Sequence, residues 1–190
     1  MPNRRTTFLA DEFYHLYNRG VDRAVVFFHE DNYRYFMRLL EAKAARESIG
    51  IVAFCLMPNH FHLLIRPGRD HSVSRFLNSL LGSYVQGLNA ARNRVGPLFQ
   101  GRTRSVHVAR DEFLAHVARY IHLNPVAASL VPRPQDWPYS NYAAVITGQG
   151  GHIADGLLVG GIFPDRASYK NFVEAPQPTE LPASLKLAGS

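Results

Sequence analysis

Two apolar stretches, 51–56 and 60–66, constrain the fold of this chain more than any other feature of its sequence. They are separated only by Met57-Pro58-Asn59, and a short connection containing Pro and Asn is typical of a hairpin between antiparallel strands. In the second stretch apolar residues alternate with others, so one face of the predicted strand is wholly apolar while the other carries His60 and His62. The sequence therefore predicts a central hairpin with a polar site on one face.

The His60 and His62 pair has two interpretations. Side chains two residues apart on a strand project side by side, so both imidazoles are placed to bind one divalent ion. The chain contains nine histidines, however, and two half-exposed strand histidines without a ligand also fit the pattern. The pair alone leaves both interpretations open.

Hydrophobic periodicity places the remaining elements around this hairpin. A period near 3.6 indicates helices, and alternation indicates strands. The predicted strands are 13–17, 51–56, 60–66 and 98–108, and the predicted helices are 31–47, 73–93, 112–123 and a short one at 139–146. We expect Pro125 to end the third helix at Asn124, because a residue before proline avoids α geometry. We expect one domain at 1–147 and an extension at 148–190 whose prolines indicate a loosely ordered end.

Charge and cysteine content narrow the class of protein. Lys and Arg number 21 against 15 Asp and Glu, and the net charge of +6 favours a polyanionic partner such as nucleic acid. The single cysteine, Cys55, excludes an intramolecular disulfide and a cysteine zinc cluster, and its apolar surroundings predict a buried thiol. We find neither an apolar run long enough to span a bilayer nor the apolar core of a signal peptide, so we expect a cytoplasmic protein without membrane contact.

Several arginines are candidates for phosphate contacts. Arg19 stands at the end of the first predicted strand, and Arg102 and Arg104 stand two residues apart in the strand 98–108, where they would point the same way. Solvated arginines on an edge strand are the competing interpretation. Other nucleophile arrangements lack support in the sequence, since the chain has no Gly-x-Ser-x-Gly elbow, no phosphate-binding loop with lysine and no His-Glu-x-x-His helix.

Two longer blocks carry a resemblance to a known family. They are Met57-Pro-Asn-His-Phe-His-Leu-Leu-Ile65 and Arg119-Tyr-Ile-His-Leu-Asn-Pro-Val126. Further matches, in the same order as in the family, are Tyr14-His-Leu-Tyr-Asn-Arg-Gly20, Phe99-Gln-Gly-Arg102 and Trp137-Pro-Tyr-Ser-Asn-Tyr142. Over residues 13 to 146 the chain resembles the single-tyrosine transposases of the HUH superfamily, and it is most similar to the REP-associated tyrosine transposases.

This resemblance implies a fold and a set of site residues. The fold is α+β, a ferredoxin-like antiparallel sheet flanked by α-helices. His60, His62 and Asn124 would bind a divalent metal, Mg²⁺ or Mn²⁺, and Tyr120 would be the catalytic nucleophile. His122, in the same block as Tyr120, points elsewhere on the helix, and we interpret it as structural.

The resemblance also implies an activity and a partner. A metal-dependent endonuclease and strand transferase would form a 5′-phosphotyrosine intermediate with single-stranded DNA that carries a hairpin, such as a repetitive palindromic element. Arg19, Arg102 and Arg104 are the candidate DNA-binding residues. Ala127-Ala128 departs from the Arg-Ala that relatives often carry, which would remove one DNA contact. Whether the protein works as a monomer or a homodimer stays open.

Three other functions compete with this hypothesis. A domesticated relative would bind structured single strands without cleaving them, although binding alone does not require His60, His62, Tyr120 and Asn124. A small metallohydrolase would use the histidine pair to activate water, and its activity would survive the replacement of Tyr120 by phenylalanine. A structural or regulatory interaction protein explains neither the metal pair nor the nucleophile.

Overall fold

The computed structural model describes residues 7–109, 111–149 and 157–176 of the chain. Its centre is a four-stranded sheet in the order β2-β3-β1-β4, in which every neighbouring pair is antiparallel. The strands are β1 (Phe13–Arg19), β2 (Ile49–Met57), β3 (His60–Pro67) and β4 (Arg104–Val108). Helix α1 (Glu30–Glu47) connects β1 to β2, and α2 (Ser72–Ala91) connects β3 to β4. This β-α-β-β-α-β order confirms the expected ferredoxin-like α+β fold.

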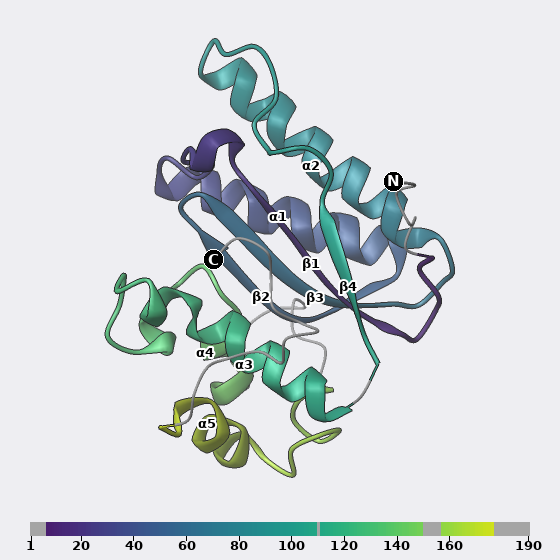
Figure 1. Cartoon of the computed structure of the whole chain (residues 1–190), viewed down its shortest axis with the longest axis vertical. Coiled ribbons are helices and arrows are strands. Elements are labelled where there is room, and N and C mark those ends of the chain that lie inside the picture. Colours follow the sequence, from purple (N-terminus) through teal and green to yellow (C-terminus); the bar gives the residue numbers. More distant parts are fainter. Residues whose placement is uncertain (1–6, 110, 150–156, 177–190) are drawn as a thin grey trace.

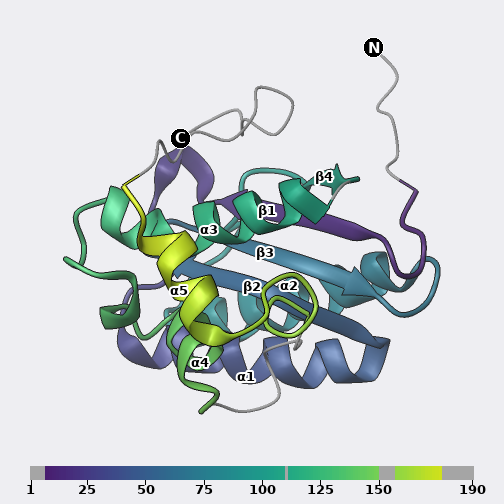
Figure 2. The ribbon, with the colours of Figure 1, turned by 90° about the horizontal axis from the view of Figure 1, so that it is seen from below.

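The two faces of the sheet are covered by different helices (Figures 1 and 2). On one face, Phe61 and Leu63 of β3 belong to a core that α1 and α2 complete with residues such as Phe36 and Tyr84. On the other face, Leu64 belongs to a second core that is completed by α3 (Asp111–Ala127), α4 (Tyr142–Thr147) and α5 (Arg166–Glu174). The alternation seen in the sequence of β3 is therefore the alternation between two cores.

The fourth strand is shorter than predicted. The sequence predicted a strand at 98–108, but only Arg104–Val108 pairs with β1 as a strand, and the preceding segment joins the sheet through a single bridge between Gly20 and Phe99. Gly101 adopts a positive φ of 66°, which turns the chain between these two parts. Arg102 follows this turn and lies outside the strand, so Arg102 and Arg104 do not share a strand face.

Helix α3 continues past the point at which we expected it to end. It runs to Ala127 with Pro125 inside it, so Tyr120 lies about two turns from its end rather than in its last turn. After the proline, the amide of Ala128 still donates to the carbonyl of Asn124 (2.9 Å). A proline this close to a helix end removes one backbone donor without disturbing many turns, and Asn124 consequently keeps its place on the helix surface.

Residues after 148 contribute a helix that the sequence did not predict. Helix α5 begins after Asp165, whose carboxylate caps it by accepting the amide of Ser168 (2.7 Å). Its Tyr169 and Val173 are fully buried in the second core. Among the prolines that we took as signs of a loose end, Pro178 and Pro182 lie outside the described residues.

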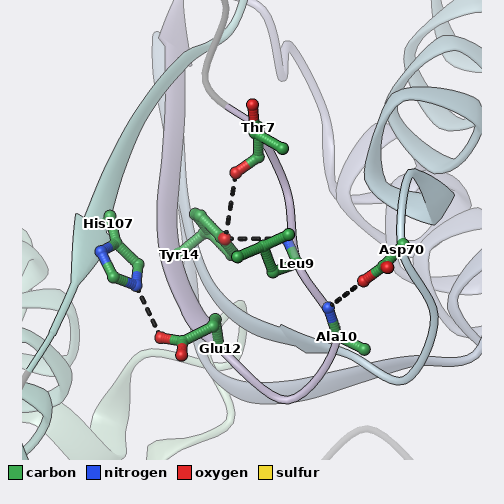
Figure 3. Close-up of polar contacts among 7 residues, drawn as sticks. All are labelled: Thr7, Leu9, Ala10, Glu12, Tyr14, Asp70 and His107. Atoms are coloured by element: carbon green, nitrogen blue, oxygen red, sulfur yellow. Dashed lines mark hydrogen bonds and ion pairs between the residues drawn. The ribbon is translucent and has the colours of Figure 1, made fainter.

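Polar contacts fix two segments at the edges of the fold, the residues before β1 and the segment that lies along the outer edge of β2. Residues before β1 are held by Tyr14, whose hydroxyl accepts the amide of Leu9 (2.9 Å) and donates to the carbonyl of Thr7 (3.2 Å), and His107 contacts Glu12 (2.7 Å; Figure 3). The outer edge of β2 is covered by the segment before α4, where the Tyr139 carbonyl accepts the amide of Leu56 (2.9 Å).

Among the helices described, none combines the length and apolarity that crossing a membrane requires.

Candidate active site

The register of β1 against β3 gathers polar side chains at one end of the sheet, on the face covered by α3. Arg19 lies opposite His60 and Tyr17 lies opposite His62, so these four residues project from the same face. They line a cavity of about 460 Å³. The other residues that line it are Asn18, Arg23, Met57, Asn59, Gln100, Arg104, Tyr120, Asn124, Ala127 and Ala128.

The two histidines of the predicted pair lie side by side, with ring centroids 5.0 Å apart and ring planes at 86°. In each ring, Nδ1 already has a hydrogen-bond partner. His60 Nδ1 lies 2.7 Å from the side-chain oxygen of Asn59, and His62 Nδ1 lies 3.0 Å from Nε2 of His15. Because an amide oxygen only accepts, the Nδ1 of His60 carries the proton and its Nε2 keeps a lone pair.

Burial makes neutral imidazole the stable form of both rings. Desolvation lowers the pKa of His60, a hydrogen bond that the protonated ring can donate to the Asn124 side chain opposes that shift, and the charge of Arg19 adds to the lowering. Desolvation also lowers the pKa of His62 well below its usual range, and proximity to His15 and His60 lowers it further. Neutral imidazoles with free lone pairs are the form in which histidine binds metals.

Helix α3 brings Tyr120 and Asn124 to the histidines. The rings of Tyr120 and His62 are 5.6 Å apart between centroids, and the Asn124 side chain interacts with both the His60 imidazole and the Tyr120 hydroxyl. The Asn124 amide nitrogen donates to the backbone carbonyl of Tyr120 (2.8 Å), which fixes the side chain one turn beyond the tyrosine. Burial raises the pKa of Tyr120, and the hydrogen bond with Asn124 partly offsets this shift. The resting residue is therefore a phenol.

The donor set suits a divalent ion of the Mg²⁺ or Mn²⁺ type. Two imidazole nitrogens and one amide oxygen converge from His60, His62 and Asn124, and their rings and amide are already oriented by neighbouring hydrogen bonds. Across the part of the chain that the structure describes, no cluster of three or more His, Cys, Asp or Glu side chains is suited to a metal. A metal site at His60 and His62 would consequently depend on Asn124 and on ligands from solvent or substrate.

The predicted arginines fall into two groups. Arg19 and Arg104 line the cavity, together with Arg23, and the Arg19 guanidinium donates to the side chain of Gln100 (2.7 Å). Glycine is required next to Arg19, because a Cβ on Gly20 would lie 2.0 Å from the carbonyl oxygen of Ala24. Arg102 is exposed and does not line the cavity.

Some residues of the site escaped the analysis of the sequence. His15 and Tyr17 lie on the same face of β1 as Arg19, and Asn59 occupies the turn before His60. The alternation of His15, Tyr17 and Arg19 was visible in the sequence. Its meaning depended on the pairing of β1 with β3, which joins residues more than forty positions apart.

His122 has the structural role that we expected. Its ring is fully buried, with Nδ1 2.7 Å from the Tyr169 hydroxyl and Nε2 2.9 Å from the side-chain oxygen of Asn141. These partners join α3 to α5 and to the start of α4. Burial lowers the pKa of His122 to about 4, so the ring is neutral at physiological pH.

Comparison with known proteins identifies relatives of this chain. A model of the family described as IS200-like transposases matches residues 10–124, a span that includes His60, His62, Tyr120 and Asn124. The chain is 30% identical over 101 residues to a Haemophilus influenzae protein that bears the name REP-associated tyrosine transposase, and the match covers 48% of this chain and 57% of that protein. A solved structure of a REP-associated tyrosine transposase bound to a REP hairpin superposes with a TM-score of 0.67 at 17% identity, covering 82% of this chain and 94% of the other. At that identity the likeness shows a shared fold.

Proposed function

Because this chain belongs to the IS200-like transposase family, we propose that it is a transposase that cleaves and rejoins single-stranded DNA through Tyr120. The observation that carries this proposal is the convergence of Tyr120, His60, His62 and Asn124 on one cavity. A phenol ring next to two neutral imidazoles, with arginines at the cavity wall, provides a nucleophile, a cation site and phosphate contacts together. A water-activating hydrolase would not require the tyrosine.

We propose that His60, His62 and Asn124 hold the divalent ion. When bound, Mg²⁺ or Mn²⁺ would act as a Lewis acid that polarises a non-bridging oxygen of the scissile phosphate. Imidazole nitrogens suit Mn²⁺ at least as well as Mg²⁺. Asn124 has two tasks, because its side chain interacts with the Tyr120 hydroxyl as well as with His60.

The proposed reaction is an in-line displacement at phosphorus. The Tyr120 oxygen forms the new bond to phosphorus, the bond from phosphorus to the 3′ oxygen breaks, and the leaving oxygen takes up a proton to become a 3′ hydroxyl. The 5′-phosphotyrosine keeps the energy of the phosphodiester, so a second displacement by another 3′ hydroxyl can rejoin the DNA without ATP. Removal of the phenol proton is needed in the first step, since burial raises the pKa of Tyr120.

The proposed partner is single-stranded DNA with a hairpin. The structural neighbour is described as bound to a REP hairpin, and the net charge of +6 of this chain suits a polyanion. Arg19, Arg23 and Arg104 at the cavity wall are placed to contact the phosphates that flank the cleavage site. Arg102, outside the cavity, is assigned to DNA beyond it.

A covalent-adduct assay tests the proposal. Wild type, Tyr120→Phe and Tyr17→Phe are incubated with a hairpin-bearing single strand under Mn²⁺, Mg²⁺ or EDTA, and the products are separated on a denaturing gel. The label belongs at the 3′ end, because the 5′-phosphotyrosine retains the 3′ fragment. Tyr17→Phe removes another phenol from the same cavity and is the matched control. We expect a metal-dependent protein–DNA band in wild type and in Tyr17→Phe that is absent from Tyr120→Phe. Cleavage that persists in Tyr120→Phe without an adduct would refute the proposal in favour of a hydrolase.

A further inference from the structure

A third histidine lies directly behind the histidine pair. His15 of β1 is diagonal to His62 across the β1–β3 pairing, with the two ring centroids 5.2 Å apart and His15 Nε2 3.0 Å from His62 Nδ1. His15 is only 1% exposed and does not line the cavity. Burying an imidazole costs free energy unless its nitrogens find partners, so a packing role alone would favour an apolar residue here.

The hydrogen bond between His15 and His62 determines whether Nε2 of His62 has a lone pair that can bind a cation. One hydrogen is shared between two neutral rings, and it belongs either to His62 Nδ1 or to His15 Nε2. When His62 Nδ1 carries it, His62 Nε2 has a lone pair. When His15 Nε2 carries it, the hydrogen of neutral His62 moves to Nε2, and that nitrogen can no longer bind a cation.

His60, the other histidine of the pair, has a similar partner behind its ring, and that partner is an oxygen that can only accept a hydrogen bond. His60 Nδ1 lies 2.7 Å from the Asn59 side-chain oxygen, which can only accept, so the Nε2 of His60 keeps its lone pair. His15 Nε2 occupies the equivalent place behind His62. Two rings that must offer Nε2 to one ion each need an acceptor behind them.

We propose that His15 is a positioning residue that accepts the Nδ1 hydrogen of His62 and thereby keeps the Nε2 lone pair of His62 available for the divalent ion. The inference rests on the metal site of the proposed function. It assigns His15 to the Nδ1–H tautomer, with Nε2 as the acceptor. His15 lies outside the cavity and acts on the metal site through His62, and its ring also packs edge-on against the Tyr120 ring, with centroids 6.4 Å apart.

Two substitutions separate this role from packing. His15→Gln keeps a carbonyl oxygen close to the position of Nε2, so it restores an acceptor for His62. His15→Leu has similar bulk without a polar atom. If His15 served only to fill space, neither substitution would change the tautomer of His62 through the loss or return of an acceptor.

The first measurement is the tautomer of His62 by ¹⁵N NMR of the metal-free and DNA-free protein near pH 8. We expect His62 as the Nδ1–H tautomer in wild type and His15→Gln, and a loss of that preference in His15→Leu. An Nε2–H tautomer of His62 in wild type, or an unchanged tautomer in His15→Leu, would overturn the inference. Neither result bears on adduct formation by Tyr120, so failure here and failure of the proposed function are distinct.

The second measurement is Mn²⁺ affinity with hairpin DNA bound, in a Tyr120→Phe background that cannot consume the DNA. Removing a partner that orients a metal ligand typically lowers metal affinity about 10- to 100-fold. We expect a loss of that size for His15→Leu and an affinity close to that of the parent for His15→Gln. Equal losses in both variants, or no loss in either, would overturn the inference, whereas no Mn²⁺ binding by the parent would instead refute the metal site itself.

Discussion

Replacing His122 with glutamine should flatten the dependence of folding stability on pH. The ring is fully buried, and its two nitrogens contact the Tyr169 hydroxyl and the Asn141 side-chain oxygen. Asn141 donates through its amide nitrogen to the carbonyl of Val52 and accepts the amide of Phe54 at its oxygen, so that oxygen faces His122 as an acceptor. In the neutral ring Nε2 donates to the Asn141 oxygen and Nδ1 accepts from the Tyr169 hydroxyl, so both nitrogens have partners without a second proton.

The size and sign of the effect follow from the pKa. Burial lowers the pKa of His122 from 6.5 to about 4. At pH values between 4 and 6.5 the unfolded chain therefore binds a proton at His122 that the folded chain does not bind. The contribution is fully present above pH 6.5 and falls by about 1.4 kcal/mol per pH unit as the pH decreases toward 4. At pH 5 the loss from this residue is roughly 2 kcal/mol. His15, whose pKa burial lowers to about 3, changes stability in the same direction.

Urea denaturation in EDTA at several pH values between 7.5 and 5 measures this slope. Glutamine retains a donor and an acceptor but does not titrate, so His122→Gln should lower stability at pH 7.5 while removing the loss of roughly 2 kcal/mol that His122 contributes between pH 7.5 and 5. His116→Gln, at an exposed position of the same helix, is the control and should keep the wild-type slope. An identical slope in wild type and His122→Gln would refute the assignment of His122 as a buried neutral base.

Two further predictions concern Arg19 and Cys55. Arg19→Gln should weaken the binding of hairpin DNA uniformly across sequences and lower the slope of log affinity against log salt by about 0.7 to 0.9, whereas a sequence-specific loss with an unchanged slope would contradict a phosphate contact. The Cys55 thiol is fully buried, and burial raises its pKa, so it should resist a disulfide reagent in the native protein and react only in urea. Rapid labelling of the native protein would show that this strand opens.

Local periodicity predicted the centre of the fold because each residue of a paired strand faces one side or the other. The apolar side of β3 lies in the core under α1 and α2, and the side with His60 and His62 faces α3. The hairpin, the two long helices and the burial of Cys55 followed from such short-range patterns.

Three differences from the sequence predictions have separate physical causes. Leu98 and Phe99 are buried and Phe99 bridges to Gly20 although it belongs to no strand, so these two apolar residues suggested a longer strand. The helix containing Pro125 continues because its last turn is supported after the proline, where the restriction of Asn124 by the following proline predicted an end. Helix α5 is short, and its buried Tyr169 and Val173 are too few to produce a strong periodic signal.

The residues of the candidate site also differ in how far the sequence alone could reveal them. His60 and His62 were visible as a pair on one strand, whereas Tyr120 and Asn124 were linked to them only by family resemblance. The structure places all four around one cavity. His15 could not have been assigned, because its relation to His62 depends on the register of β1 against β3 rather than on any spacing along the chain.

The helix that carries Tyr120 is held in place from its other side. Arg119, one residue before Tyr120, is buried and donates to the carbonyls of Phe172, Val173 and Ala175 at the end of α5. A guanidinium at a helix C-terminus meets unpaired carbonyls and the negative end of the helix dipole, which compensates its buried charge. Arg119 and His122 are three residues apart and form the anchored face of α3, while Tyr120 and Asn124 are four apart and face the cavity. The segment 157–176, which follows the matched family span of 10–124, therefore helps to set the position of Tyr120 against the histidine pair.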